Sequence, residues 1–303
     1  MSAPTLNNTS SPAPAGRTTR AKAKKPAPGR RYGMGTWAIW ALLVVGAAVV
    51  AFPFYWMFVT SVTPGGQATS NEFYLWPEAF TWSNYEEAFT RLPMAQWIAN
   101  SMTIAVIGTV LSVFVSMLAG YAFAKFRFRG RTMIFFLYLL TIMVPIQVTL
   151  VPSFLVIVKL GLVDSIWGVI LPGAAEATAV FIARQFMLSL PHELIEAARM
   201  DGLGELKIFF RIVVPLSGPL VGVLAILAFM GRWNEFLWPM MVLQGEESQT
   251  LPVGLASLQG GEAFASPWGT ILAVATISVI PVLVIFLIFQ RQFVRGIAST
   301  GLK

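Results

Sequence analysis

The side chains that most often carry enzyme chemistry are nearly missing from this sequence of 303 residues. It has no cysteine and a single histidine, His192, which excludes disulfide frameworks, thiolate nucleophiles and histidine-rich metal sites. It also lacks the phosphate-binding pattern G-x-x-x-x-G-K-S/T, so it has no such route to ATP. We therefore expect no catalytic residue, no metal site and no bound cofactor in this chain. If ATP and Mg²⁺ drive its function, a partner must bind them.

The most informative polar stretch is Ser189–Gly204, with the sequence SLPHELIEAARMDGLG. Pro191 suits a first helical position, and Glu193 suits a first turn, where the helix dipole favours an acid. The following residues are compatible with a short helix that stops at Gly202. This helix is too short and too polar to span a bilayer. Its two adjacent alanines present little bulk, so it suits a groove on another protein, with its register fixed by the charges of Glu196, Arg199 and Asp201.

A second group of polar residues lies within apolar sequence, where a charge costs roughly 2.5–3.5 kcal/mol or more. Glu176 falls near the middle of one apolar block, and two interpretations stay open: it lines a solute path, or it faces a water-filled crevice or a partner subunit. Arg232 and Glu235 are one turn apart near the end of another block, and they either pair with each other or line the path. Asn234 and Trp233 beside them suit a sugar, although Trp at a membrane boundary is also an ordinary anchor.

Long apolar blocks must position these residues. Hydrophobic residues make up 56% of the sequence and charged residues 12%, and a soluble domain carries about twice that charge. Several blocks approach the roughly 20 residues that cross a bilayer core. The predicted fold class is therefore all-α integral membrane, with six transmembrane helices and one short cytoplasmic helix. The predicted spans are residues 37–59, 98–124, 133–158, 166–188, 213–238 and 269–289.

Prolines and small residues predict details of these spans. Pro145 and Pro152 should kink or interrupt the third span, and Pro281 should kink the sixth. Small residues recur at intervals of four along the second span, which predicts a face that another helix approaches closely. These residues are Gly108, Ser112, Ser116 and Gly120.

The charges between the spans alternate in sign along the chain. Basic residues dominate both ends and the turn after the second span, whereas acidic residues dominate the segments after the first and fifth spans. The positive-inside rule then places both termini in the cytoplasm. The net charge of +7 thus reflects membrane orientation, and we expect no nucleic-acid partner. The predicted organisation is a disordered basic cytoplasmic tail (1–36), a six-helix domain (37–290) that includes a loop at about 190–215, and a cytoplasmic tail (291–303).

The loop at residues 190–215 resembles the EAA loop of the permeases of ATP-binding-cassette (ABC) importers, and we refer to it as the EAA loop. Glu196-Ala197-Ala198 is followed after three residues by Gly202, and after nine more by Ile212-Val213-Val214-Pro215. The family pattern is EAA, three residues, G, nine residues, I-x-L-P, so the only departure is Val214 in place of Leu.

Three further segments resemble the carbohydrate-importer permeases of the maltose-permease type, and the likeness covers nearly all of the chain from residue 37 onward. They are Arg232–Pro239 (RWNEFLWP), Thr250–Gly254 (TLPVG) and Gln290–Gly296 (QRQFVRG).

The resemblance implies the type I importer permease fold, in a multi-pass protein of the bacterial cytoplasmic (inner) membrane. It implies a second permease subunit in a heterodimer, two ATPase subunits that bind ATP and Mg²⁺, and an external solute-binding protein. In the maltose importer the partner permease supplies most sugar contacts, so a complete sugar site is not expected in this chain. The contact with the ATPase would be made by Glu196, Ala197, Ala198, Arg199, Asp201, Gly202 and Pro215.

The resemblance favours transport of a mono-, di- or oligosaccharide, and two alternatives stay open. A glycerol-phosphate permease shares most of these motifs, although an anionic substrate would need more intramembrane Arg or Lys. A proton-coupled secondary transporter would use Glu176 as its proton-binding site, but it would leave the EAA loop unexplained. A membrane enzyme is disfavoured because no cluster of His, Cys or carboxylates converges on a predicted face.

Overall fold

A computed structural model describes residues 34–65, 74–259 and 267–300 of this chain, with side chains between residues 37 and 288. The chain divides into two compact units, residues 1–50 and 51–303. The described part of the first unit consists of most of the apolar helix α1 (Met34–Ser61). Most of the predicted N-terminal tail lies outside the described residues, and the last helix continues past residue 290 to Thr300.

The described residues form helices joined by turns and loops, which confirms the all-α fold class. A 3₁₀ turn (Thr141–Met143) follows α5, and a π-helical turn (Phe209–Val213) follows α10. Besides α1, the helices are α3 (Ser83–Arg91), α4 (Met94–Lys125), α5 (Arg131–Leu140), α6 (Ile146–Lys159), α7 (Ile166–Ile170), α8 (Ala177–Leu188), α9 (His192–Met200), α10 (Glu205–Ile208), α11 (Val214–Leu216), α12 (Gly218–Trp233), α13 (Leu237–Val242), α14 (Leu251–Ser257) and α15 (Trp268–Thr300).

Three of the described helical stretches are long and apolar enough to cross a membrane by themselves: Trp37–Ser61, Met94–Lys125 and Trp268–Ile288. Two bent pairs raise the number to five if each pair is one span. Residues 131–143 and 146–159 meet at 105°, and residues 205–216 and 218–233 meet at 82°. The number of six spans therefore stays a prediction.

The predicted fourth span, residues 166–188, is wrong as a single helix. It is divided into α7 and α8 by a non-helical link at residues 171–176, which contains Pro172 and Gly173. Proline lacks the amide hydrogen that would continue the α7 ladder, and glycine adds a flexible link. The predicted break at Pro145 is confirmed, because Pro145 immediately precedes α6. Pro152 and Pro281 lie inside α6 and α15, and neither ends its helix.

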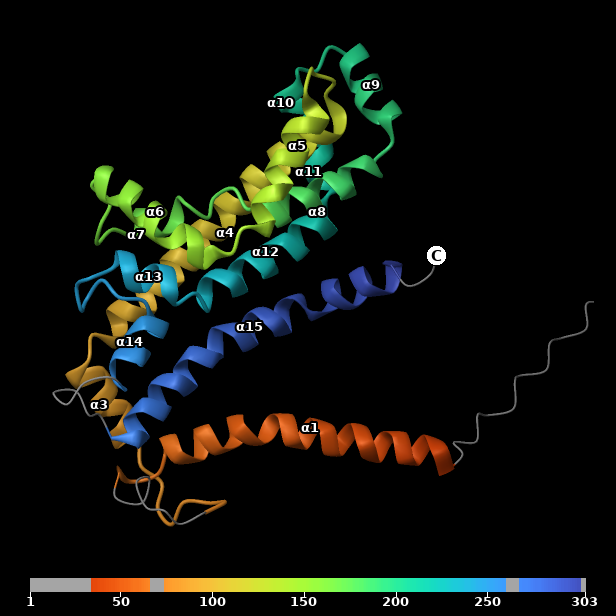
Figure 1. Cartoon of the computed structure of the whole chain (residues 1–303). Coiled ribbons are helices and arrows are strands. Elements are labelled where there is room, and N and C mark those ends of the chain that lie inside the picture. The colour runs from red at the N-terminus through yellow and green to blue at the C-terminus, as the bar shows by residue number, and fades with distance from the viewer. Residues whose placement is uncertain (1–33, 66–73, 260–266, 301–303) are drawn as a thin grey trace, which may run out of the picture. The chain divides into compact units, whose positions relative to one another are not determined.

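Helix α4 is the central element of the second unit, and α8 and α12 pack along it (Figure 1). The small-residue stripe is buried, and its closest approach is to α8. A Cβ atom at Gly120 would lie 2.6 Å from the Cβ of Ala183 and 2.8 Å from the amide nitrogen of Arg184. The predicted packing face is therefore confirmed, and its neighbours are α8 at Gly120 and the α12 side chain Arg232 at Gly108.

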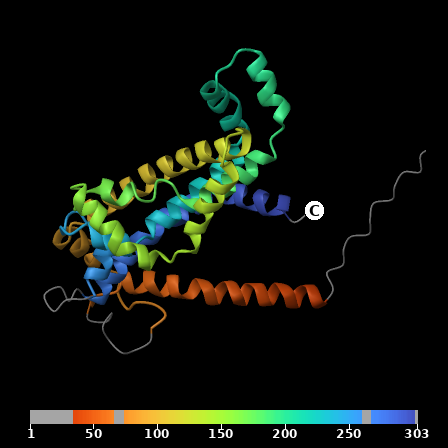
Figure 2. The same ribbon diagram turned by 45° about the horizontal axis from the view of Figure 1, so that its top comes forward.

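The two ends of α4 pack against different sets of helices (Figures 1 and 2). At one end, α9 and α10 join α4, α8 and α12 around a buried apolar cluster that includes Tyr121, Ile195 and Phe209. At the other end, α3, α14 and α15 surround the buried Trp97. A third cluster joins α4 to α6, α7 and α13. The EAA loop thus packs against the C-terminal end of α4.

Candidate functional site

The EAA loop contains the predicted short helix, α9, which begins after Pro191 and ends before Gly202. Pro191 lies one position outside the helix, where its extended ψ of 132° starts the turn into α9. Only Ile195 and Ala198 of this helix are buried, with 2% and 5% of their surface exposed. Glu196 and Ala197 are exposed on the other side of the helix.

The two adjacent alanines therefore have different surroundings. Ala198 packs into the apolar cluster of its own chain, whereas Ala197 faces outward beside Glu196. The two alanines differ because successive side chains of a helix point about 100° apart, so Ala198 supports α9 from within the chain while its contact with an ATPase stays a prediction. Of the three residues Glu196, Ala197 and Ala198, the first two are therefore the exposed ones.

Gly202 ends α9 in a left-handed conformation, with φ of +79°. Its amide donates to the carbonyl of Arg199 at 3.0 Å, and the amide of Leu203 donates to the carbonyl of Ala198 at 3.0 Å. This pair of bonds is the Schellman motif, and Leu203 completes it by packing against the same cluster as Ala198. The glycine of the family pattern thus meets a backbone requirement here, since residues with a side chain disfavour this φ.

The charges of the EAA loop divide into two groups. Arg199 donates to Oε1 of Glu205 at 2.6 Å, and this hydrogen bond raises the pKa of the guanidinium above its ordinary value. Glu196 and Asp201 are exposed. Pro215 is exposed in α11, two residues before the 82° bend that leads into α12.

The ionisable residues predicted inside the membrane meet at a polar groove, which we define as two adjoining cavities of about 640 and 190 Å³. Glu176, Arg232 and Glu235 line the larger cavity, and the last two also line the smaller one. The walls come from three interrupted stretches of helix: the break between α5 and α6, the link between α7 and α8, and the end of α12. Backbone of this kind is tolerated at membrane depth where it lines a water-filled cavity.

Glu176 is not in the middle of a helix, as the sequence suggested, but is the residue that precedes α8, with extended backbone. Arg232 donates through Nη2 to the carbonyl of Gly173 at 2.6 Å, so its head group is held on the link between α7 and α8. Glu176 and Glu235 are both within electrostatic range of that guanidinium. Among the described side chains, Arg232 and Glu235 do not form the direct ion pair that the sequence left open.

Trp233 and Asn234 do not line the groove, so two of the residues predicted on the solute path are placed elsewhere. Trp233 is 2% exposed and donates through its indole to the carbonyl of Ser278 at 3.0 Å. The amide of Asn234 donates to the carbonyl of Met230 at 2.8 Å, which satisfies the end of α12. Sequence reasoning missed Gly173, whose carbonyl accepts from Arg232, although the neighbouring Pro172 is a signal of a broken helix.

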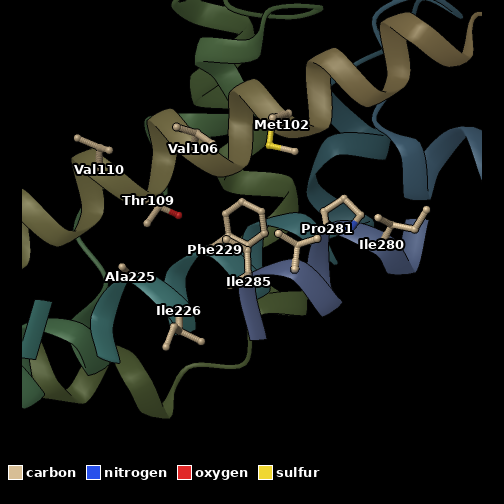
Figure 3. A pocket seen from close by; sticks show the side chains of 11 residues that line it. Met102, Val106, Thr109, Val110, Ala225, Ile226, Phe229, Ile280, Pro281 and Ile285 are labelled. Carbon is tan, nitrogen blue, oxygen red and sulfur yellow. The ribbon is translucent and has the colours of Figure 1, made fainter. Parts of the chain in front are cut away.

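A separate cavity of about 420 Å³ lies between α4, α12 and α15 (Figure 3). Its lining side chains are apolar except for Thr109, whose hydroxyl lacks a hydrogen-bond partner in the structure. A hydroxyl-rich solute would lose its hydrogen bonds to water here without replacing them. This cavity therefore suits apolar chains, and the polar groove is the better candidate for a solute path.

Residues 112–299 match the family described as the binding-protein-dependent transport system inner membrane component. The chain belongs to this family. The matched region includes the EAA loop, the polar groove and the helices that carry them. The likeness of the motifs to ABC importer permeases is thereby confirmed.

Curated relatives and a solved structure agree with this assignment. The permease is 37% identical over 269 residues to the arabinooligosaccharides transport system permease protein AraQ of Halalkalibacterium halodurans, covering 86% of this chain and 96% of that one. It is 34% identical to the sn-glycerol-3-phosphate transport system permease protein UgpE of Yersinia pestis, covering 86% and 94%. A chain of a bacterial ABC transporter involved in import of the acidic polysaccharide alginate has a TM-score of 0.77 and 28% identity, covering 88% of this permease and 99% of that chain.

Proposed function

We propose that this permease forms half of the translocation pore of an ABC importer for an uncharged sugar. A second permease completes the pore, two ATPase subunits bind ATP and Mg²⁺, and an external solute-binding protein delivers the sugar. Both termini and the EAA loop lie in the cytoplasm. The observation that carries the proposal is the exposed face of α9, where Glu196 and Ala197 stand clear of the chain's own core.

The polar groove supports an uncharged solute. It carries the carboxylates of Glu176 and Glu235 against one guanidinium, and Arg232 already holds the carbonyl of Gly173. An anion would meet more negative than positive charge, whereas sugar hydroxyls donate to carboxylates and accept from arginine. This favours a substrate like that of the arabinooligosaccharide relative over glycerol phosphate or an acidic polysaccharide.

A pull-down tests the assembly. Tagged permease is purified in detergent from its native membrane, and the proteins that co-purify are identified by mass spectrometry. We expect a second permease and an ATPase, with the ATPase lost from Glu196→Lys because the change reverses the charge on the exposed face of α9. Glu247→Lys, an equally exposed reversal outside the EAA loop, is the matched control and should retain the ATPase.

Uptake tests the substrate class. Cells that lack this permease, complemented with the wild-type chain, should gain ATP-dependent uptake of labelled arabinotriose but not of labelled sn-glycerol 3-phosphate. Glu176→Gln and Glu235→Gln should reduce sugar uptake without loss of the co-purified ATPase. Uptake of glycerol phosphate alone would support the anionic alternative. Uptake abolished by an uncoupler but insensitive to ATP depletion would support a proton-coupled transporter.

A further inference from the structure

The last turn of α4 contacts the segments on both sides of α9, at Leu190 and at Glu205. Tyr121 and Lys125 are one turn apart and so lie on the same side of α4. Lys125 is 4% exposed, and its ammonium donates to the carbonyl of Leu190, just before α9, at 2.6 Å. The hydroxyl of Tyr121 donates at 3.0 Å to Glu205, which follows α9. We refer to these contacts, with Arg199, as the α4 clamp.

Glu205 joins three helices through one carboxylate. It is the first residue of α10, its Oε2 accepts from Tyr121 of α4, and its Oε1 accepts from Arg199 of α9 at 2.6 Å. The guanidinium of Arg199 also lies 5.9 Å from the ring centroid of Phe126. Hydrogen bonds between charged groups are roughly twice as strong as neutral ones and are directional. The carboxylate therefore fixes the angle of α9 as well as its distance from α4.

Apolar packing alone would not fix that angle. Every residue of α9 except Ile195 and Ala198 is exposed, so its apolar contact is narrow. Burial of apolar surface is non-directional, and a helix held by a narrow contact can rock on it. The α4 clamp holds α9 at a point before its start and at its last turn, which removes this freedom.

We propose that the α4 clamp, centred on Glu205, transmits displacement of α9 to α4 and so to the polar groove. This inference rests on the proposed function, since it assumes that an ATPase moves α9. Along α4, Tyr121 lies thirteen residues from Gly108, about 20 Å of rigid helix. A Cβ atom at Gly108 would lie 2.7 Å from the side chain of Arg232, so α4 at that level is in contact with the groove.

The clamp holds α9 in place and does not contact substrate or ATP. Its loss should therefore change the coupling between ATP hydrolysis and transport, and leave binding of the ATPase unchanged. Variants that break it leave the exposed Glu196 and Ala197 unchanged, so the ATPase should still bind and hydrolyse ATP. Movement of α9 would then reach α4 incompletely. The result is uncoupling: ATP hydrolysis continues while less sugar is moved for each ATP.

The first measurement is the number of sugar molecules transported per ATP in proteoliposomes that contain the complex purified from the native membrane, with its solute-binding protein. Glu205→Gln and Tyr121→Phe should lower this ratio about two- to tenfold. This is the factor by which the loss of one hydrogen bond changes an equilibrium. Phenylalanine keeps the ring contact with Phe209, at 5.6 Å between centroids. An unchanged ratio would overturn the proposal.

Matched controls lie at the other end of the chain's core. Tyr85 also shares a hydrogen bond through its hydroxyl, with Ser61 at 2.7 Å, and Glu87 also forms an ion pair, with Arg91 at 2.7 Å. Tyr85→Phe and Glu87→Gln therefore repeat the two substitutions away from the EAA loop. Both should keep the wild-type ratio. A loss as large as that in the clamp variants would overturn a specific role for the clamp.

A second measurement needs no partner subunit. The sequence has no cysteine, so Met200→Cys on α9 and Val110→Cys on α4, both at exposed positions, give one defined pair of spin labels. Glu205→Gln should broaden the distance distribution between the labels in the full-length permease, and an unchanged distribution would overturn the clamp. Absence of any ATPase from the wild-type preparation would overturn the proposed function, and the role of the clamp in transmission with it. This failure can be told apart from failure of the clamp proposal alone, because it is seen in the wild-type protein before any variant is made.

Discussion

The EAA loop and the polar groove are built in opposite ways. The residues of the loop are contiguous in sequence, and their geometry is closed by local bonds, such as those from Gly202 and Leu203 back to α9. The groove draws on residues 141–149, 172–178 and 227–235, which meet only because α4 gathers α8 and α12. A local motif keeps its shape through backbone geometry. A groove assembled from interrupted helices depends on how neighbouring segments pack.

The largest expected effect concerns helix packing, and it sets Gly120 of the stripe against Gly173 of the groove. Gly120→Val would drive a side chain into Ala183 and the backbone of Arg184, neither of which can turn aside, at a cost of about 1–3 kcal/mol or more. At Gly173 the nearest atoms, 3.0 Å away, belong to the flexible Arg232 side chain. We therefore expect a clearly lower Tm in detergent for Gly120→Val than for Gly173→Val.

The control for this comparison is Gly46→Val in α1, since no atom of another segment lies within 4 Å of a Cβ at Gly46 and no proline follows it directly. Its Tm should stay near that of the wild type. Equal losses at Gly120 and Gly173 would mean that the groove is packed as rigidly as the contact between α4 and α8, and the contrast drawn above would fail.

A smaller effect is expected at the end of α9, where conformation matters rather than space. Gly202→Ala meets no neighbouring atom but places a side chain at φ of +79°, which costs about 1–2 kcal/mol. Amide exchange in α9 should accelerate and uptake should fall. Gly204→Ala, where φ is −72° and the space is also open, is the matched control. Equal exchange in the two variants would show that the left-handed turn is not what ends the helix.

The smallest effect is expected in the turn that follows α13, which Asp164 holds from the link between α6 and α7. Asp164 accepts from the hydroxyl of Ser248 and from the amides of Gly245 and Gln244, and these bonds hold its pKa below the ordinary value. A lowered pKa means that the stabilisation is complete above the ordinary Asp pKa of about 3.9 and is lost as the pH falls through the lowered value. The side chain is exposed, so the effect should be modest.

Amide exchange of residues 244–248 checks this expectation. At pH 7, Asp164→Asn should exchange faster than the wild type, because the neutral amide is a weaker acceptor. The ratio of the two rates should approach one only when the pH falls below the lowered pKa of Asp164. A ratio of one at pH 7 would show that the Asp164 carboxylate does not support this turn.

Several features were predictable because they depend on a few consecutive residues. The apolar blocks predicted an all-α membrane protein, Pro145 predicted a break, and the pattern before Gly202 predicted the end of a short helix. The small residues at intervals of four predicted a packing face, because helical periodicity places them on one side of α4. None of these inferences required knowledge of which helix is the neighbour.

The sequence by itself thus determined the helical class, the family motif and the ends of α9, since these follow from local backbone rules and periodicity. Only the tertiary structure decided that Arg232 and Glu235 line the groove while Trp233 is buried against α15, and that Ala198 is buried while Ala197 is exposed. The physical reason is that a helix turns by about 100° per residue. Adjacent residues therefore face different surroundings, and those surroundings are supplied by segments far away in the chain.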